Sequence, residues 1–462
     1  MRKIVLEEHG YFWWHDEPIP DGHFAPESSI TGVLKIDEEG QIELELHGVL
    51  PNQESASSKF IQGILKGTDK HTLLMELSPH ERQFSTNGIS YEGFSAINCL
   101  IGDSPFPYGK ALLFRKLEVD LKGYEEWLRL GSIEVNRTQT RVSANYKKPK
   151  DITYLLDDGK ITIKYDCYGS YQGKHRRHDL SLSESVSLTY GFIKAITPEE
   201  IKAQHGLLED LFILLADSDY CLDWPLLSLG NKKYTYYFLR NRSSARAPKW
   251  YECGTSFVAL RESFGQIFST WKKKREVFGP GFSLYLATRR GMTLYSEHRF
   301  VTLIWGIESF HKTKNPDKPH SFKVLNKIQR ILEQVTAQND KEWLRKRLSP
   351  KYRLADRIFE IFQTLPLGLD EKMLCQFSSS CARKRNDISH GVQRGSGDYS
   401  KFAIDLERQS NALAYLYHAL LLQEVGVDER IINQWIYQGY QSHRIKNTFV
   451  EVGLLNEELG MP

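Results

Sequence analysis

Hydrophobic residues change their spacing part-way along the chain, and this change divides it into two structural classes. Up to about residue 196, short segments alternate apolar and polar residues, as in 32–36, 41–46, 160–165 and 185–190. A two-residue period is typical of strands with one buried face. The turn sequences Asp-Glu-Glu-Gly and Asp-Asp-Gly, just before the second and third of these segments, predict hairpins. Residues 1–196 are therefore predicted to be mainly β, in a sandwich or barrel.

Residues 197–288 carry signals of both helix and strand. Thr197 is a candidate N-cap, and a proline and two glutamates follow it, which predicts a helix that ends near Ala216. The aromatic segment 233–240 predicts a strand, and 255–275 predicts a helix. We group this mixed α/β part with the β-rich region, which gives a first domain of residues 1–288.

Beyond residue 288, apolar residues recur at the three- and four-residue intervals of amphipathic helices. The tail from about Asn447 is expected to pack on the surface or to fray. The predicted fold class is therefore α+β multidomain, with a β-rich N-terminal region followed by an all-α helical bundle over 289–462. Helices are expected at 292–312, 321–337, 341–363, 370–390, 399–425 and 428–440.

The composition is typical of a globular protein and gives little sign of its partners. A chain of 462 residues fits two or three domains. Hydrophobic residues make up 40% and charged residues 26%, which argues against disorder. The net charge of +3 is small for this length, so any contact with nucleic acid has to come from local basic patches.

Cysteine usage and the apolar segments predict a cytoplasmic protein without membrane contact. Six cysteines are scattered and form no Cys-x-x-Cys pair, which favours a reducing compartment. Glu7 and Glu8 interrupt the N-terminal apolar run, so no signal peptide is predicted. The most apolar long stretch, 207–229, contains acidic residues throughout and does not fit a membrane span.

Several enzyme classes have no support in the sequence. We find no Walker loop, no dinucleotide-binding glycine motif, no Gly-x-Ser-x-Gly and no His-Glu-x-x-His, and we expect no cofactor. Glu308 and His311 match the Glu-x-x-His spacing of carboxylate-bridged metal bundles, but the second copy that such sites need is absent. We therefore expect no metal. Glu308 is expected instead to make a polar contact inside the bundle or to support a functional motif.

That motif lies in the stretch Cys381–Gly391, which places Arg385, Asn386 and His390 within six positions. A guanidinium suits a phosphate, and histidine transfers protons near neutral pH. On a helix, Asn386 and His390 share a face, and the long Arg385 side chain reaches towards them. The three side chains can converge on one phosphate. The spacing alone is a weak signal, because basic helices carry such combinations by chance.

The sequence around the motif strengthens this prediction. Arg-Asn-Asp-Ile-Ser-His-Gly lies between two long helical patterns and resembles the Arg-x4-6-His signature of the HEPN superfamily, in which a polar residue commonly follows the arginine. The aromatic opening Gly10–His15, followed by strands and Leu-Glu-Leu-His-Gly at 44–48, resembles the N-terminal domain of ApeA-type HEPN proteins.

This resemblance implies an endoribonuclease that needs no metal. Arg385 and His390 would line a cleft between two paired domains, which makes a homodimer through the HEPN domain the expected state. The ribose 2′-OH attacks the neighbouring phosphorus, so RNA, such as tRNA or phage RNA, is the implied substrate. Antiphage defence by abortive infection is the implied role, with the N-terminal region sensing a phage-derived trigger or holding the nuclease in check.

Two alternatives stay open at this point. Some HEPN domains keep the fold and act as non-catalytic modules that bind RNA or a nucleotide and mediate dimerisation. Arg383 and Lys384 are weak candidates for RNA phosphate contacts, since such residues often serve only to solvate a helix. The same holds for three basic clusters, at 174–178, 272–275 and 341–353.

Overall fold

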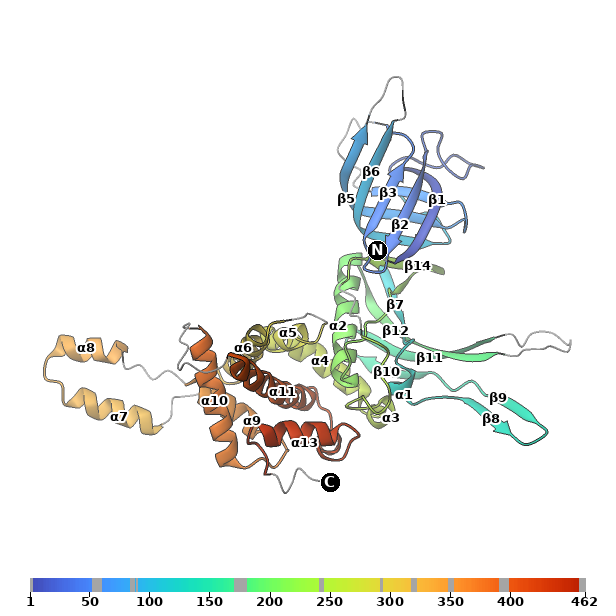
Figure 1. Cartoon of the computed structure of the whole chain (residues 1–462). Coiled ribbons are helices and arrows are strands. Elements are labelled where there is room, and N and C mark those ends of the chain that lie inside the picture. Colours follow the sequence, from blue (N-terminus) through green and yellow to red (C-terminus); the bar gives the residue numbers. More distant parts are fainter. Residues whose placement is uncertain are drawn as a thin grey trace. The chain divides into compact units, whose positions relative to one another are not determined.

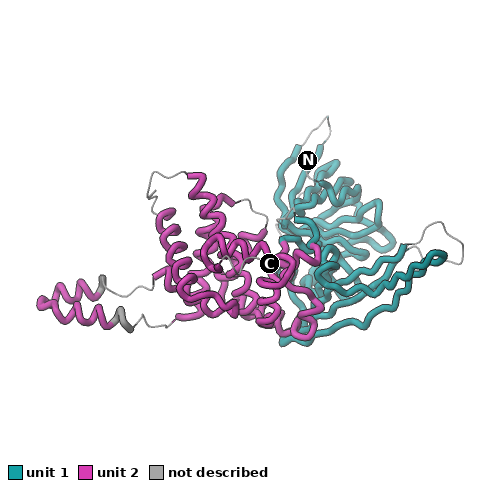
Figure 2. Tube along the Cα trace, turned by 60° about the horizontal axis from the view of Figure 1, so that its bottom comes forward, with its two compact units in different colours: residues 1–210, 219–248 teal, residues 211–218, 249–462 magenta. Residues whose placement is uncertain are grey.

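The computed structural model describes residues 3–51, 60–83, 88, 90–169, 181–240, 245–290, 294–316, 322–347, 353–389 and 399–456. The chain forms two compact units, one of residues 1–210 and 219–248 and the other of residues 211–218 and 249–462 (Figure 2). The division falls within helix α2 (Pro198–Ala216). The division at residue 288 stays a prediction of domain organisation.

The first unit contains a closed antiparallel barrel (Figure 1). The strand order is β6-β3-β2-β1-β4-β5, and pairing of β5 with β6 closes the ring. The alternating pattern explains the core: in β3 the three apolar side chains are buried, and Glu43 and Glu45 are exposed. A barrel thus forms where the sequence predicted a sandwich or barrel. Its strands are β1 (Ile4–Trp14), β2 (Ile30–Asp37), β3 (Ile42–Leu46), β4 (Phe60–Leu65), β5 (His71–Gln83) and β6 (Tyr91–Gly102).

The long strand β6 also leads out of the barrel into a second run of strands. Beyond Ala96 its free edge pairs with β14, and the sheet continues in the order β14-β13-β7-β12-β11-β10. A separate ribbon of two strands lies between β7 and β10 in the sequence. The predicted strand at 233–240 is confirmed. The elements are β7 (Phe114–Asp120), α1 (Glu125–Leu128), β8 (Ile133–Arg137), β9 (Val142–Tyr146), β10 (Ile152–Leu156), β11 (Gly159–Gly169), β12 (Leu182–Ile196), β13 (Leu226–Leu229) and β14 (Lys232–Phe238).

Helix α2 begins as the sequence predicted. The backbone N–H of Glu200 donates to Oγ1 of Thr197 at 3.3 Å, and the backbone N–H of Thr197 donates to Oε2 of Glu200 at 2.8 Å. This reciprocal pair is a capping box, which satisfies two backbone donors at the helix start. The helix ends at Ala216, at the predicted position.

The second unit is helical. In its bundle, α9 packs against α6 and α10, and α11 packs against α6. The apolar face of α6 recurs at the helical period and is fully buried at Phe300, Leu303, Ile304 and Ile307. The helices are α3 (Phe257–Leu260), α4 (Phe264–Phe278), α5 (Pro280–Ala287), α6 (Ser296–Lys314), α7 (Phe322–Glu333), α8 (Gln338–Arg347), α9 (Leu354–Gln363), α10 (Glu371–Ser389), α11 (Tyr399–Glu424), α12 (Glu429–Tyr437) and α13 (Ser442–Glu451).

Three predicted elements differ from the structure. The segment 255–275 forms two helices, α3 and α4, and the segment 341–363 forms α8 and α9, not one helix. Pro350, which disfavours a continuous helix, lies between α8 and α9 and outside the described residues. The tail from about Asn447, predicted to pack on the surface or to fray, instead buries Phe449 of α13 and Leu454 completely.

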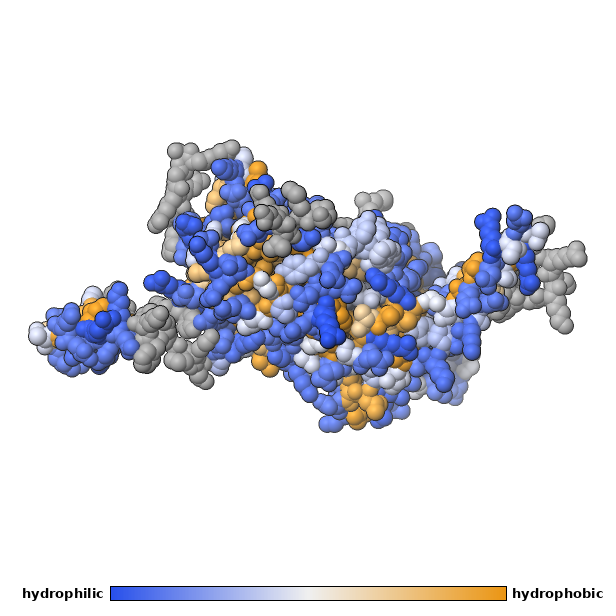
Figure 3. Space-filling model, turned by 90° about the horizontal axis from the view of Figure 1, so that it is seen from below, coloured by the Kyte–Doolittle hydropathy of each residue, from blue (hydrophilic) through white to orange (hydrophobic). Residues whose placement is uncertain are grey.

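The face drawn in Figure 3 is mainly hydrophilic. It carries scattered hydrophobic areas among polar ones. Among the described residues, no helix combines the length and the hydropathy needed to cross a membrane.

Candidate functional site

Arg385 and Asn386 of the motif lie on helix α10, beyond the part of the helix that is buried in the core. Its first three turns bury one face, including Leu374, Phe377 and Cys381. After Ala382 no residue of the helix up to Ser389 is buried. Arg385 and Asn386 therefore lie where the helix meets solvent, and the Arg385 side chain keeps 25% of its area exposed.

Contacts on both sides orient the Arg385 guanidinium. Its Nη1 donates to Oδ1 of Asn386 at 3.2 Å. Its Nη2 lies 3.6 Å from Oε2 of Glu308, on the neighbouring helix α6. The Nε of Arg385 is buried and has no hydrogen-bond partner among the described residues. Both terminal nitrogens of the guanidinium are thus oriented, while a quarter of the side-chain area stays exposed.

Glu308 interacts with three cationic side chains, each from a different helix. Its Oε1 accepts from Nη1 of Arg357 in α9 at 3.0 Å and lies 3.0 Å from Nζ of Lys312, one turn further along α6. With Arg385 from α10, one carboxylate faces three positive side chains. The positive charge is in excess, so the cluster orients Arg385 without cancelling the local attraction for a phosphate.

The sequence pointed to some members of this cluster and missed others. Glu308 was expected to make a polar contact in the bundle or to support the motif, and it lies beside Arg385. Lys312 could have been found as an i,i+4 partner of Glu308. Arg357 is 49 residues from Glu308, so only the packing of α9 on α6 reveals that contact.

The structure describes Arg383 and Lys384, but His390 lies outside the described residues. His390 follows Ser389, the last residue of α10. Arg383 is exposed, and Lys384 is half-buried. Burial lowers the pKa of Lys384, and nearby Asp405 opposes that change.

A polar contact with α11 fixes the middle of α10. Nε2 of Gln409 donates to Oγ of Ser380 at 2.9 Å, and Sγ of Cys381 lies 4.0 Å from Oε1 of the same amide. Cys381 is fully buried, and burial raises the pKa of its thiol. The thiol is therefore a core group and not a nucleophile at neutral pH.

Glu308 and His311 point to different partners. Glu308 faces the three cations described above, whereas Nε2 of His311 lies 2.9 Å from Oε2 of Glu360 in α9. Among the described residues, no group of three or more histidine, cysteine or acidic side chains could hold a metal ion.

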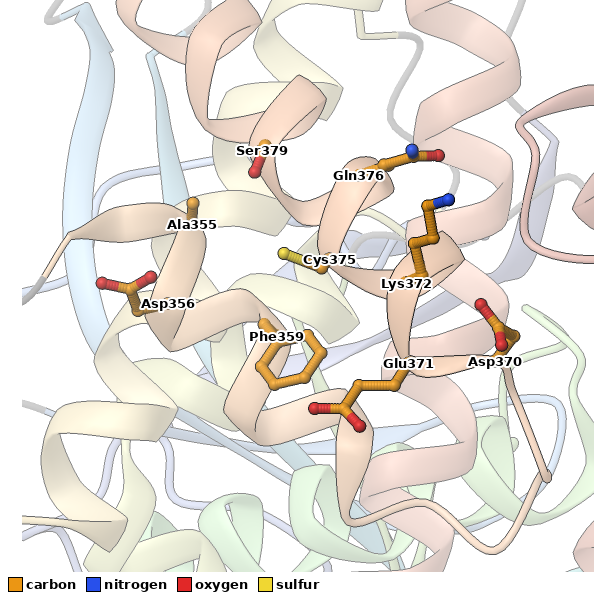
Figure 4. A pocket seen from close by; sticks show the side chains of 9 residues that line it. All are labelled: Ala355, Asp356, Phe359, Asp370, Glu371, Lys372, Cys375, Gln376 and Ser379. Carbon is orange, nitrogen blue, oxygen red and sulfur yellow. The ribbon is translucent and has the colours of Figure 1, made fainter.

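A groove of about 640 Å³ runs between α9 and the first half of α10 (Figure 4). Phe359 and Cys375 lie along it, and Asp356, Glu371 and Lys372 add charges. Neither Arg385 nor Asn386 lines this groove. It is therefore separate from the motif, which lies more than one helical turn beyond Ser379, the last α10 residue that lines it.

Comparison with known families shows which family the chain belongs to. The model of ApeA N-terminal domain 1 matches residues 7–271, more than half of the chain, and the model of Apea-like HEPN matches residues 301–431. The chain belongs to the ApeA-like HEPN family. The Apea-like HEPN match contains both Glu308 and the motif from Arg385 to His390. No curated protein and no solved structure matches the chain.

Membership in the ApeA-like HEPN family gives the function in outline. HEPN domains serve as nucleases or as RNA-binding domains, and ApeA proteins are linked to defence. The β-rich region followed by the HEPN bundle is the architecture that the sequence predicted.

Proposed function

We propose that the chain is a metal-independent endoribonuclease that acts in antiphage defence by abortive infection. The observation that carries this proposal is the Arg385 guanidinium at the solvent-facing end of α10, oriented by Glu308 and Asn386. His390, five residues after Arg385, supplies the proton-transfer group that the reaction needs. The nuclease function of the HEPN family supports the same reaction.

The roles follow from the chemistry of RNA cleavage. The ribose 2′-OH attacks the adjacent phosphorus, and the 5′-oxygen of the next nucleotide leaves, which forms a 2′,3′-cyclic phosphate. His390 takes the proton from the 2′-OH or returns one to the leaving oxygen. Arg385 stabilises the extra negative charge on the phosphorane oxygens, and Asn386 orients the phosphate or the imidazole. DNA lacks the 2′-OH and is not cleaved in this way.

Charge at the cluster suits an RNA backbone. Glu308 offsets one of the three cations around it, and Arg383 is exposed two residues before Arg385 on the same helix. Excess positive charge attracts phosphates in a salt-dependent manner. RNA, including tRNA and phage RNA, is the proposed substrate class.

The proposed active form is a cytoplasmic homodimer paired through the HEPN domain. One chain holds a single Arg385–His390 motif, and two motifs would supply two histidines for the acid and the base steps. The N-terminal region is proposed to respond to a phage-derived trigger. A monomer that cleaves RNA at micromolar concentration would contradict the dimer.

Cleavage of labelled tRNA and total RNA in excess EDTA tests the activity. We expect the wild type to leave 2′,3′-cyclic phosphate ends, and Arg385→Ala and His390→Ala each to lower the rate at least about 100-fold. Arg430→Ala in α12 and His443→Ala in α13 are matched controls, because both side chains are exposed and outside the motif. Both controls should cleave at the wild-type rate.

The same assay separates the nuclease from a binding module. The His390→Ala variant of a nuclease should still bind RNA nearly as tightly as the wild type. A wild-type protein that binds RNA but leaves it intact, even with extract from phage-infected cells, would favour the non-catalytic function.

A further inference from the structure

The first unit, which contains the barrel, has a cavity of about 460 Å³ that the nuclease reaction does not use. Its walls come from the residues after β1, the start of β4, the middle of β5, the loop after β6 and the start of α2. All of these segments belong to the first unit. The volume is in the range of small-molecule sites.

The charged groups around this cavity are mainly negative. Asp16, Glu76 and Glu199 contribute carboxylates, and Lys110 contributes a positive charge. Among the described residues, three carboxylates against one ammonium give the lining a negative field. Buried Tyr236 senses this field: burial raises its pKa, and the charges of Glu199 and Glu76 raise it further.

His15 adds a polar aromatic ring to the wall of the cavity. Its Nδ1 lies 2.7 Å from Oε1 of Gln62, which is 3% exposed. A carbonyl oxygen can only accept, so Nδ1 is the donor in this contact. The imidazole also packs edge-on against Phe60 and Tyr108, with ring centroids 6.2 and 5.9 Å away. Acceptors and aromatic rings therefore meet in one cavity.

Glu76 is held in an unusual backbone conformation. Its φ of +55° lies in the left-handed region although the residue is inside strand β5, which costs on the order of 1 kcal/mol. Its Oε1 accepts from Nδ2 of Asn98 at 3.0 Å. Asn98 is 3% exposed, and its Oδ1 is buried with no hydrogen-bond partner among the described residues. Such strain persists where the surrounding structure fixes a residue, often at a functional site.

We propose that this cavity binds a cationic hydrogen-bond donor, an alkylammonium or a guanidinium group. The cation donates to Glu76 and Glu199, and its alkyl chain packs against Leu73 and Met75. The Tyr108 ring adds a cation–π contact. An anionic ligand would meet three carboxylates and is excluded by the same field. The proposal does not depend on RNA cleavage.

Two sources carry this chemistry, and one experiment distinguishes them. The chain has five methionines, and Met75 lines the cavity. Full-length protein labelled with 13C at the methionine methyl groups is titrated with spermidine, with an acetylated and amidated Gly-Lys-Gly peptide, and with the Gly-Glu-Gly counterpart. We expect the Met75 methyl signal to shift with spermidine, with the lysine peptide or with both, and to stay in place with the glutamate peptide.

Charge-removing variants test the site itself. Glu76→Gln keeps an acceptor for Asn98 and loses the charge, and Glu199→Gln is its counterpart at the start of α2. The double variant should weaken binding of the amine at least about tenfold. Glu43→Gln, on the exposed side of β3, is the matched control and should bind like the wild type.

Each outcome decides the proposal. A Met75 shift with spermidine alone assigns the site to free polyamines, and a shift with the lysine peptide alone assigns it to a basic side chain of a polypeptide. No Met75 shift with either cation at millimolar concentration overturns the proposal. Equal binding by the double variant, or an equal response to the glutamate peptide, overturns it as well.

Discussion

At the scale of single residues, Glu308 links the motif to the rest of the bundle. Sequence spacing identified Arg385, Asn386 and His390 because they lie within six positions. The same spacing could not reveal Arg357, whose contact with Glu308 exists only because α9 packs on α6. Local motifs are therefore readable from sequence, whereas the groups that orient them depend on packing between distant segments.

Glu308→Gln should separate binding from catalysis. The amide keeps an acceptor for Arg357, but it no longer attracts Arg385 as a charge. We expect kcat for RNA cleavage to fall on the order of tenfold, because Arg385 is less well positioned. RNA should bind as tightly or more tightly, because one negative charge beside the phosphate site is gone.

Single-turnover cleavage and RNA titration at two salt concentrations measure these two effects. Glu429→Gln, exposed at the start of α12, is the control and should change neither quantity. A parallel loss of RNA affinity and cleavage would argue that Glu308 acts only by stabilising the fold.

The buried His418 is expected to make the stability of the second unit depend on pH. Its ring lies fully buried between Oη of Tyr285, 2.6 Å from Nδ1, and the carbonyl oxygen of Leu214, 2.8 Å from Nε2. Burial lowers its pKa to about 4. Between that value and the ordinary pKa near 6.5, the unfolded chain binds a proton that the folded chain does not. Stability is therefore kept above about pH 6.5 and lost as the pH falls.

Urea unfolding at pH 7 and pH 5 measures this contribution. His418 alone should account for a loss of about 2 kcal/mol between these pH values. His418→Asn is expected to be less stable at pH 7 but to show a smaller loss on acidification. An equal loss in the variant and the wild type would assign the pH dependence to other groups.

At the scale of elements, periodicity predicted strands such as β3 and β11 and most of the long helices, because those segments bury one face. It failed where little of a segment is apolar. Helix α13 buries Ile445 and Phe449, four residues apart, amid polar neighbours, so the sequence indicated a tail that packs on the surface or frays. The break between α8 and α9 was missed because charged residues there carried no period of their own.

Phe449→Ala tests whether α13 is part of the core. The ring is fully buried, so its removal should lower the free energy of unfolding by about 3 kcal/mol or more. Asn447→Ala, on the exposed side of the same helix, should cost less than about 0.5 kcal/mol. Urea unfolding followed by tryptophan fluorescence measures both. Equal, small effects would instead support a tail that packs on the surface or frays.

At the scale of the whole molecule, the proposed dimer makes the nuclease depend on two motifs. Arg385→Ala and His390→Ala each inactivate a homodimer, but a mixed dimer holds one intact arginine and one intact histidine. If a cleavage site draws Arg385 from one protomer and His390 from the other, mixing the two inactive proteins restores up to about a quarter of wild-type activity, since half the dimers are mixed and one of their two sites is complete. Co-refolding or co-expression allows the exchange, and RNA cleavage in EDTA measures the result. No recovery, in a sample shown by differential tagging to contain mixed dimers, would rule out a site that draws Arg385 from one protomer and His390 from the other.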